Sequence, residues 1–234
     1  LMGKKTVVFG SFVVDLMGRT PHLPAAGETV KGTVFKMGPG GKGFNQGVAA
    51  HKAGADVTMV TKLGRDSFAD IALNTMKELG MKQDRLLYSD DTETGCALIM
   101  VDENTSQNEI VVILGSCNTI SDAEVDSLED LLDGCEYMLT QLETNVSSVE
   151  RIVDIACKKG VKVILNTAPV QPISDELLSK VDLITPNEVE AEILTGVKVD
   201  SEEAADKAAE WFFSKGVKRV LITLGQRCLH QHRR

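Results

Sequence analysis

The sequence contains no hydrophobic run of the roughly 20 residues that a membrane-spanning helix needs. Residues 1–5 lead directly into a strand-like segment and lack the apolar stretch and cleavage site of a signal peptide. A basic surplus is also absent, because 25 Lys and Arg stand against 34 Asp and Glu and give a formal net charge of −9. A surface for nucleic acid or an anionic membrane needs a basic footprint. We therefore expect neither nucleic acid nor a membrane among the partners of this chain.

The five cysteines do not form any pair with the spacing of a metal site or a redox motif. They are scattered and odd in number, at positions 96, 117, 135, 157 and 228. Reduced thiols in the cytosol are the simplest interpretation, so we expect a cytoplasmic protein. The isolated His22 and His51 do not suggest a metal site either.

Short apolar segments alternate with segments of helical periodicity along most of the chain. We predict strands over residues 6–9, 57–60, 137–141, 161–165, 183–185 and 220–223. We predict helices over residues 44–54, 67–79, 147–159 and 204–215. This order is typical of an α/β fold, with a mainly parallel sheet flanked by helices on both faces. A chain of 234 residues fits one such domain, residues 1–234, whose ligands bind at the carboxyl ends of the strands.

Two stretches contain strand patterns without an intervening helix. They cover residues 16–38 and 94–115. In the second stretch, apolar segments 97–101 and 110–113 flank a turn, which predicts a β-hairpin. A small secondary sheet that projects from the main one would explain both stretches, and we expect it to act as a lid.

The strongest local signal is residues 38–46, Gly-Pro-Gly-Gly-Lys-Gly-Phe-Asn-Gln. A glycine-rich loop that leads into a helix lets backbone N–H groups approach a ligand at the positive helix end. The segment is not a Walker loop, which would need Gly at Lys36 and Ser or Thr at Gly43. Taken alone, it is equally a tight turn with an ordinary lysine, because isolated glycine-rich matches are weak.

Several motifs together resemble the ribokinase-like (PfkB) family of carbohydrate kinases. Residues 40–46 resemble its sugar-binding signature Gly-Gly-Lys-Gly-x-Asn-Gln, and Gly10, Ser11 and Asp15 resemble its first-strand motif. Further family segments, in family order, are similar to residues 24–30, 94–95, 115–118, 141–143, 166–169, 185–192 and 221–225. The resemblance implies a ribokinase-like α/β fold with a small β-sheet lid, and ATP as the phosphoryl donor.

The resemblance implies that five residues bind the sugar, namely Asp15, Gly41, Lys42, Asn45 and Glu143. Their types suit this role, because carboxylates accept hydroxyl hydrogens and an amide both donates and accepts. Three of these positions also have a simpler interpretation: Asp15 as a solvent-facing turn residue, Asn45 as a helix cap, and Glu143 as a surface carboxylate.

The resemblance further implies that Asn187, Thr223 and Gly225 bind the nucleotide and that Glu190 acts on a water-bound Mg²⁺. Mg²⁺ keeps several waters and needs few protein carboxylates. On residue type alone, Asn187 is equally the cap of a helix with an acidic first turn, and residues 223–225 are a plain strand exit. The expected cofactors are therefore ATP and Mg²⁺, and the resemblance adds K⁺ as a monovalent cation for the complete protein.

The chain departs from the family pattern at two places. Members often carry Asn two residues before the motif Asp, where this chain has Val13, so one sugar contact is in doubt. The family's Gly-Ala-Gly-Asp segment, which forms an anion hole and supplies the catalytic base, does not occur in the sequence. Because phosphoryl transfer depends on positioning and charge stabilisation, we assign no catalytic residue and expect this chain to turn over negligibly.

The tail over residues 228–234 is unlike the apolar strand expected there. If its codons are TGC CTT CAT CAG CAC CGA CGG, the frame one base later encodes Ala-Phe-Ile-Ser-Thr-Asp, an apolar strand entering a turn. We therefore hypothesise that the chain is truncated or frameshifted after Arg227 and incomplete at its C-terminus. A native short form with a basic tail is the alternative.

For the complete protein, the resemblance implies ATP-dependent phosphorylation of the primary hydroxyl of a pentose. D-ribose to D-ribose 5-phosphate is the first expectation. Fructose, a fructose phosphate or a nucleoside stay open as substrates, and so does a non-catalytic sugar-binding role. Lid strands in such kinases often pair between subunits, so we expect a homodimer through the lid.

Overall fold

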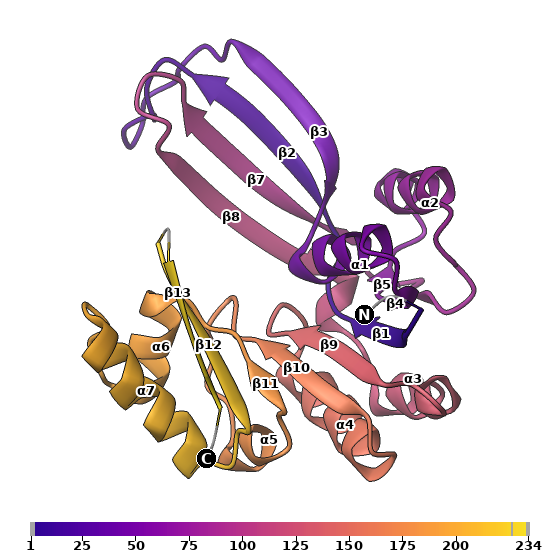
Figure 1. The fold of residues 1–234 in the computed structure, drawn as a ribbon. Helices are drawn as coiled ribbons and strands as arrows, with labels where there is room; N and C mark the ends of the chain where they lie inside the picture. Colours follow the sequence, from indigo (N-terminus) through magenta and orange to yellow (C-terminus); the bar gives the residue numbers. More distant parts are fainter. Residues whose placement is uncertain (1–2, 226, 233–234) are drawn as a thin grey trace.

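The main sheet forms the centre of the main body and has the strand order β13-β12-β11-β10-β9-β1-β4 (Figure 1). The computed structural model describes residues 3–225 and the backbone of residues 227–232. The strands of this sheet are β1 (Lys5–Phe9), β4 (Asp56–Val60), β9 (Tyr137–Gln141), β10 (Lys162–Asn166), β11 (Leu183–Ile184), β12 (Arg219–Leu224) and β13 (Arg227–His232). All neighbours from β4 to β12 pair in parallel, and β13 pairs antiparallel with β12. The predicted mainly parallel sheet is confirmed.

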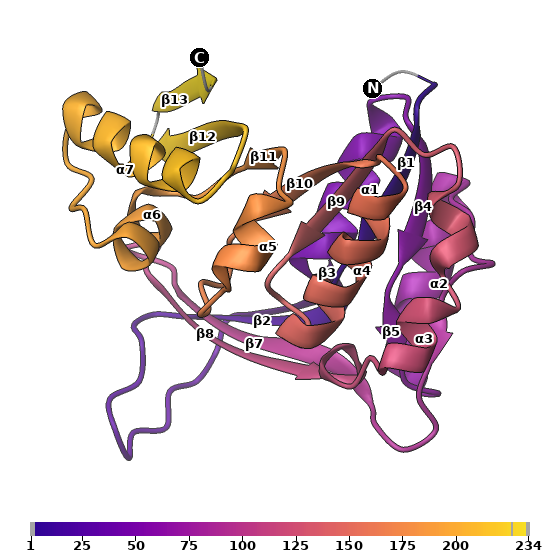
Figure 2. The ribbon, with the colours of Figure 1, turned by 90° about the horizontal axis from the view of Figure 1, so that it is seen from below.

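Helices cover both faces of this sheet, as predicted (Figure 2). They are α1 (Lys42–Lys52), α2 (Ser67–Leu79), α3 (Asp122–Asp126), α4 (Val146–Lys158), α5 (Asp175–Ser179), α6 (Glu188–Thr195) and α7 (Glu202–Ser214), with two 3-10 turns, η1 (Ser116–Asn118) and η2 (Glu129–Leu132). Alternate residues of β1 enter different cores, because successive side chains of a strand point to opposite faces. Val8 joins the cluster under α1 and α2, whereas Val7 and Phe9 join the cluster under α4 and α7.

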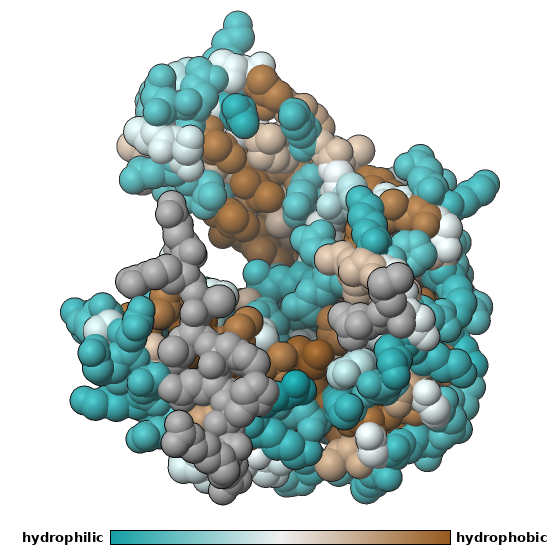
Figure 3. Space-filling model, in the orientation of Figure 1, coloured by the Kyte–Doolittle hydropathy of each residue, from teal (hydrophilic) through white to brown (hydrophobic). Residues whose placement is uncertain are grey.

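The second sheet is small and projects from the main body near β1 and α1 (Figure 1). Its strand order is β3-β2-β7-β8, and its strands are β2 (Val13–Thr20), β3 (Val34–Gly40), β7 (Thr94–Asp102) and β8 (Asn108–Gly115). The predicted hairpin is present, because β7 and β8 pair antiparallel. Figure 3 shows a hollow between this sheet and the main body. The small sheet is therefore confirmed, and its action as a lid stays a prediction.

Some element boundaries follow directly from local signals, and others do not. Helix α2 begins after Asp66, whose carboxylate accepts a hydrogen bond from Ala69 N at 2.9 Å, and ends at Gly80 with φ 69°. Helix α1 begins at residue 42, two residues earlier than predicted. The sequence also did not predict the short helices α3 and α5, the strand β13, or the pair β5 (Lys62–Leu63) and β6 (Leu87–Tyr88). It indicated α6 only through the alternative interpretation of Asn187 as a helix cap.

Strand β13 covers much of the tail for which a frameshift is hypothesised. The last two residues of that tail, 233–234, and the side chain of Cys228 lie outside the described residues. Arg227–His232 form a strand despite the low apolar content of the segment. The hypothesis about the origin of the tail stays a prediction.

Candidate active site

The first turn of α1 is packed tightly against the segment that follows β1. Gly41 precedes the helix with φ 93°, and a Cβ on it would lie 2.9 Å from backbone atoms of Ser11, Phe12 and Val13. A Cβ on Gly43 would lie 2.5 Å from Ser11 N. Only glycine combines this positive φ with such close backbone approach. The glycine-rich motif therefore brings the helix N-terminus and the end of β1 together at the carboxyl edge of the sheet.

The carboxylate of Glu143, just after β9, caps helix α1 from outside the helix. Its Oε2 accepts hydrogen bonds from Lys42 N at 2.7 Å and from Ser11 Oγ at 2.5 Å. The helix has no acidic residue in its own first turn and no side-chain cap at Gly41, so Glu143 supplies the negative charge that this end favours. Glu143 is only 5% exposed, so the interpretation as a surface carboxylate is wrong.

Asp15 reaches the same region from strand β2 of the small sheet. Its side chain fills the space over Gly40 of β3, where a Cβ would collide with the Asp15 carboxylate. Burial, followed by the charge of Glu143, raises the pKa of the Asp15 carboxyl above its ordinary value. Asp15 is half-buried within a strand, so the interpretation as a solvent-facing turn residue is wrong.

The two remaining candidate sugar ligands lie in the first turns of α1. Lys42 is its first residue, and Asn45 donates its backbone N–H to Gly41 O at 2.9 Å. The helix-cap interpretation of Asn45 is wrong, because the capping position belongs to Gly41 and the Asn45 side chain is exposed. Two carboxylates, a lysine and an amide thus surround one end of a helix, a set that can hydrogen-bond several hydroxyl groups.

Asn187 and Glu190 form a reciprocal capping box at the start of α6. Asn187 Oδ1 accepts from Glu190 N at 2.8 Å, and Glu190 Oε2 accepts from Asn187 N at 3.1 Å. Glu190 Oε1 accepts from Asn187 Nδ2 at 3.0 Å, and Thr167 donates its hydroxyl to Oε2 at 2.8 Å. The cap interpretation of Asn187 is therefore confirmed. A role of Asn187 in nucleotide binding stays a prediction.

Both oxygens of Glu190 already accept hydrogen bonds. A Mg²⁺ ion would fit this carboxylate through water molecules, because direct ligation would break the capping box. Among the described residues, no group of three or more His, Cys, Asp or Glu side chains could hold a metal ion. This donor set suits an ion that is held mainly by substrate phosphates.

Thr223 and Gly225 lie at the end of β12, next to Asn187. Thr223 forms an isolated parallel bridge with Asn187 and donates its backbone N–H to Pro186 O at 3.0 Å. Gly225 has φ 56°, and it lines a 250 Å³ pocket. The pocket lies between the start of α6, the turn before α7 and the end of β12, and its lining residues are Glu188, Val199, Asp200, Ser201, Leu224 and Gly225.

The structure thus places the predicted residues in two groups along one edge of the main sheet. The sugar group lies at the ends of β1 and β9, and the nucleotide group lies at the ends of β11 and β12. Thr167, which follows β10, adds to the nucleotide group by donating its hydroxyl to Glu190. The sequence motifs contained Ser11 and Thr167 without assigning them a role, because their partners are distant in the chain.

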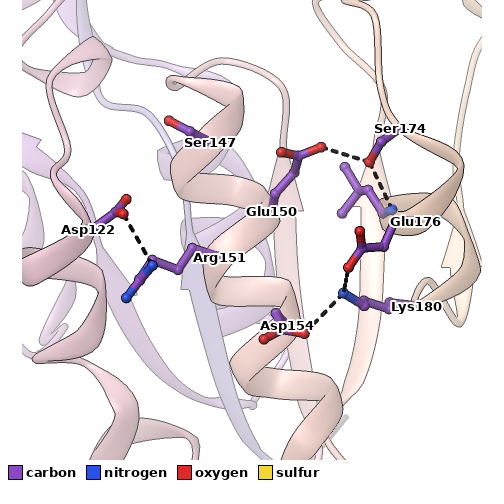
Figure 4. A pocket seen from close by; sticks show the side chains of 9 residues that line it. Asp122, Ser147, Glu150, Arg151, Asp154, Ser174, Glu176 and Lys180 are labelled. Atoms are coloured by element: carbon purple, nitrogen blue, oxygen red, sulfur yellow. Dashed lines mark hydrogen bonds and ion pairs between the residues drawn. The ribbon is translucent and has the colours of Figure 1, made fainter.

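A larger pocket, of 510 Å³, lies elsewhere, between α4 and α5 (Figure 4). Its cationic side chains are already paired: Arg151 lies 3.2 Å from Asp122, and Lys180 lies 2.7 Å from Glu176. These ion pairs leave no unpaired cationic side chain among the lining residues to attract an anionic ligand. We assign no function to this pocket.

Comparison with known proteins decides the family. The model for the pfkB family of carbohydrate kinases matches residues 4–227. The chain belongs to this family. Among curated pfkB-type relatives, a ribokinase from Haemophilus influenzae is 42% identical over 224 residues, which are 96% of this chain and 73% of that protein. A deoxyribokinase from Salmonella typhi is 36% identical, and the match covers 94% of this chain and 72% of the deoxyribokinase.

Solved structures of the family agree with this assignment. The Arabidopsis thaliana ribokinase complexed with ribose and ATP matches with a TM-score of 0.85 at 27% identity. The match covers 99% of this chain and 78% of that chain. Among the described residues, every helix is too short or too polar to span a lipid bilayer.

Proposed function

We propose that this pfkB kinase phosphorylates the primary hydroxyl of D-ribose with ATP to give D-ribose 5-phosphate. The observation that carries the proposal is the pair of carboxylates, Asp15 and Glu143, at the N-terminus of α1. Glu143 is held there by two hydrogen bonds, and Asp15 approaches from the small sheet. The ribokinase relatives, and the neighbour that holds ribose and ATP, support the same substrates.

In this proposal, Asp15, Gly41, Lys42, Asn45 and Glu143 bind the sugar. The carboxylates accept hydroxyl hydrogens, and the backbone around Gly41 allows the sugar to approach closely. The nucleotide lies along the other group, with its phosphates near Asn187, Thr223 and Gly225. Glu190 would hold Mg²⁺ through water, and the ion would supply charge neutralisation to the phosphates. The K⁺ requirement and the cytoplasmic location stay predictions.

A second candidate substrate is 2-deoxy-D-ribose. Val13 is 2% exposed and lies two residues before Asp15 on β2, so it shares the strand face of Asp15. Val13 also takes no part in either hydrophobic core cluster among the described residues. An apolar side chain next to the sugar cannot hydrogen-bond a hydroxyl, which disfavours a substrate with an extra hydroxyl there. The similarity to a deoxyribokinase supports 2-deoxyribose as an alternative substrate.

Calorimetric titration of the chain with ribose, 2-deoxyribose, fructose and a nucleoside tests the proposal. We expect ribose to bind most tightly, and a preference for 2-deoxyribose would favour the second candidate. Absence of binding by both pentoses would contradict the proposal. A coupled assay tests phosphoryl transfer: ribose-dependent ADP release would support the kinase activity, whereas ribose binding without ADP release would support the non-catalytic sugar-binding role.

A further inference from the structure

Ser11 is a fully buried polar residue that the proposed roles do not use. It follows β1, and its backbone carbonyl accepts from Phe44 N at 2.9 Å. Its hydroxyl donates to Glu143 Oε2 at 2.5 Å and lies 3.4 Å from the N–H of Gly43. Ser11 therefore contacts both α1 and the carboxylate that caps it. We propose that Ser11 is a positioning residue that fixes Glu143 for sugar binding, an inference that rests on the proposed function.

The hydrogen bonds leave one oxygen of Glu143 for a ligand. Among the described residues, the hydrogen bonds to this carboxylate come from Ser11 and Lys42, and both end on Oε2. Oε1 can therefore accept a hydrogen from a sugar hydroxyl. A hydroxyl that donates to an ionised carboxylate forms a charge-assisted hydrogen bond, which is stronger than a neutral one. Two donors from different segments fix the carboxylate plane, which a single backbone N–H would not.

The position of Glu143 also matters because Asp15 lies near it. The two carboxylates repel each other, and this repulsion contributes to the raised pKa of Asp15. Ser11 and the N-terminus of α1 hold Glu143 on the side of the main body, while Asp15 belongs to the small sheet. Without the Ser11 hydroxyl, Glu143 would lose one of the two bonds that oppose this repulsion. Ser11 thus sets the spacing between the two sugar-binding carboxylates.

The substitution Ser11→Ala should weaken ribose binding roughly tenfold, the lower end of the loss seen when a residue that orients a binding group is removed. The measurement is calorimetric titration of the full chain with ribose. Ser148→Ala is the matched control, because Ser148 is equally buried and donates its hydroxyl to a backbone carbonyl, Asn145 O, at 2.7 Å. The control should bind ribose as tightly as the unsubstituted chain.

A double-mutant cycle with Glu143→Ala separates positioning from a merely structural role. Since Ser11 acts through Glu143, Ser11→Ala should have no further effect on ribose affinity in the Glu143→Ala background. Weakened binding is measurable because ribose can be supplied at high concentration. An undiminished loss in that background would overturn the inference. Unchanged ribose affinity of Ser11→Ala alone would overturn it as well.

Two further measurements distinguish failure of the inference about Ser11 from failure of the proposed function. Ser11→Cys retains a small side chain with a weaker donor, so its ribose affinity should lie between those of Ser11→Ala and the unsubstituted chain. This variant decides the matter if Ser11→Ala does not fold, and affinity equal to that of the unsubstituted chain would then overturn the inference. If the unsubstituted chain itself binds no ribose, the proposed function fails and the inference fails with it.

Discussion

At the scale of single residues, Asp15 is a proposed binding group that lowers the stability of the ligand-free protein. Burial and the charge of Glu143 raise its pKa, so the folded protein binds a proton more readily than the unfolded chain does. Above this raised pKa, ionised Asp15 lowers the free energy of unfolding, and that loss disappears as the pH falls through the raised pKa. Ionised Asp15 is, however, the form that accepts sugar hydroxyl hydrogens.

The substitution Asp15→Asn should therefore weaken ribose binding and raise the free energy of unfolding at neutral pH. The gain should stay below about 1 kcal/mol, because solvent screens a carboxylate that is only partly buried. Urea unfolding and calorimetry measure the two effects. Asp91→Asn, which changes an exposed aspartate outside the proposed site, is the control and should alter neither. A loss of stability in Asp15→Asn would contradict this account of Asp15.

The same pKa shift predicts how ribose affinity depends on pH. Protonation removes an acceptor from Asp15, so ribose affinity should fall as the pH decreases through the raised pKa. Because the pKa is raised, the fall should begin at a higher pH than for an ordinary aspartate. Ribose titrations at a series of acidic pH values measure this fall in affinity. The Asp15→Asn variant, titrated at the same pH values, is the reference. A constant affinity down to the usual range of aspartate would argue against Asp15 as a sugar ligand.

Gly40 gives a second prediction at this scale, because a Cβ there would overlap the Asp15 carboxylate. The colliding group is the end of a side chain, so Gly40→Ala should move Asp15 rather than unfold the sheet. We expect ribose affinity to fall about 10- to 100-fold, the effect of displacing a positioning group. Gly38→Ala is a matched control on the same strand, because a Cβ at Gly38 meets nothing within 4 Å. Equal ribose affinities of the two variants would refute the prediction.

At the scale of elements, the N-terminus of α6 combines a structural and a proposed binding role. Asn187→Ala should lower the free energy of unfolding by about 1 kcal/mol, because the cap is lost. Asn187→Ser restores an acceptor for the cap but not the amide. Should Asn187 also bind phosphate, Asn187→Ser will recover stability without recovering affinity for ATP. Thermal melts and nucleotide titrations measure the two quantities.

The control for α6 is a second capping box, at the start of another helix. Helix α3 has a capping box of Ser121 and Glu124 that lies away from the nucleotide group. Ser121→Ala should lower stability to a similar extent and leave ATP affinity unchanged. Full recovery of ATP affinity in Asn187→Ser would mean that Asn187 is only a cap.

The elements also show where sequence interpretation succeeds. Helix α2 has both of its boundary signals in the sequence, Asp66 before it and Gly80 after it, and its predicted range is the observed one. The short α5 contains too few residues for a periodic pattern, and its packing on the sheet determines it. The sequence indicates α6 only by its cap, Asn187, and its acidic first turn. Within the site, motif positions could be predicted from a resemblance. The contact of Ser11 with Glu143 could not, because 132 residues separate them and only the tertiary fold joins them.

At the scale of the whole molecule, the small sheet exposes a row of large apolar side chains. Met37, Leu98 and Val111 lie in one row across the sheet, because the pairing register aligns Met37 with Leu16, Leu16 with Leu98, and Leu98 with Val111. They are 54%, 47% and 59% exposed. Contiguous exposed apolar surface usually marks an interaction site. This row supports the predicted homodimer through the lid.

We therefore expect the chain to be a dimer in solution, with the Met37, Leu98 and Val111 face at the interface. Val111→Lys should convert the dimer to monomer, because a buried, unpaired lysine charge is unfavourable. Size-exclusion chromatography with light scattering measures the mass. Ile110→Lys is a matched control: Ile110 is 52% exposed, next to Val111 on β8, and points to the opposite face of the sheet. If Ile110→Lys dissociates the dimer and Val111→Lys does not, the interface lies on the face that carries Asp15. If the unsubstituted chain is a monomer, the predicted dimer is wrong.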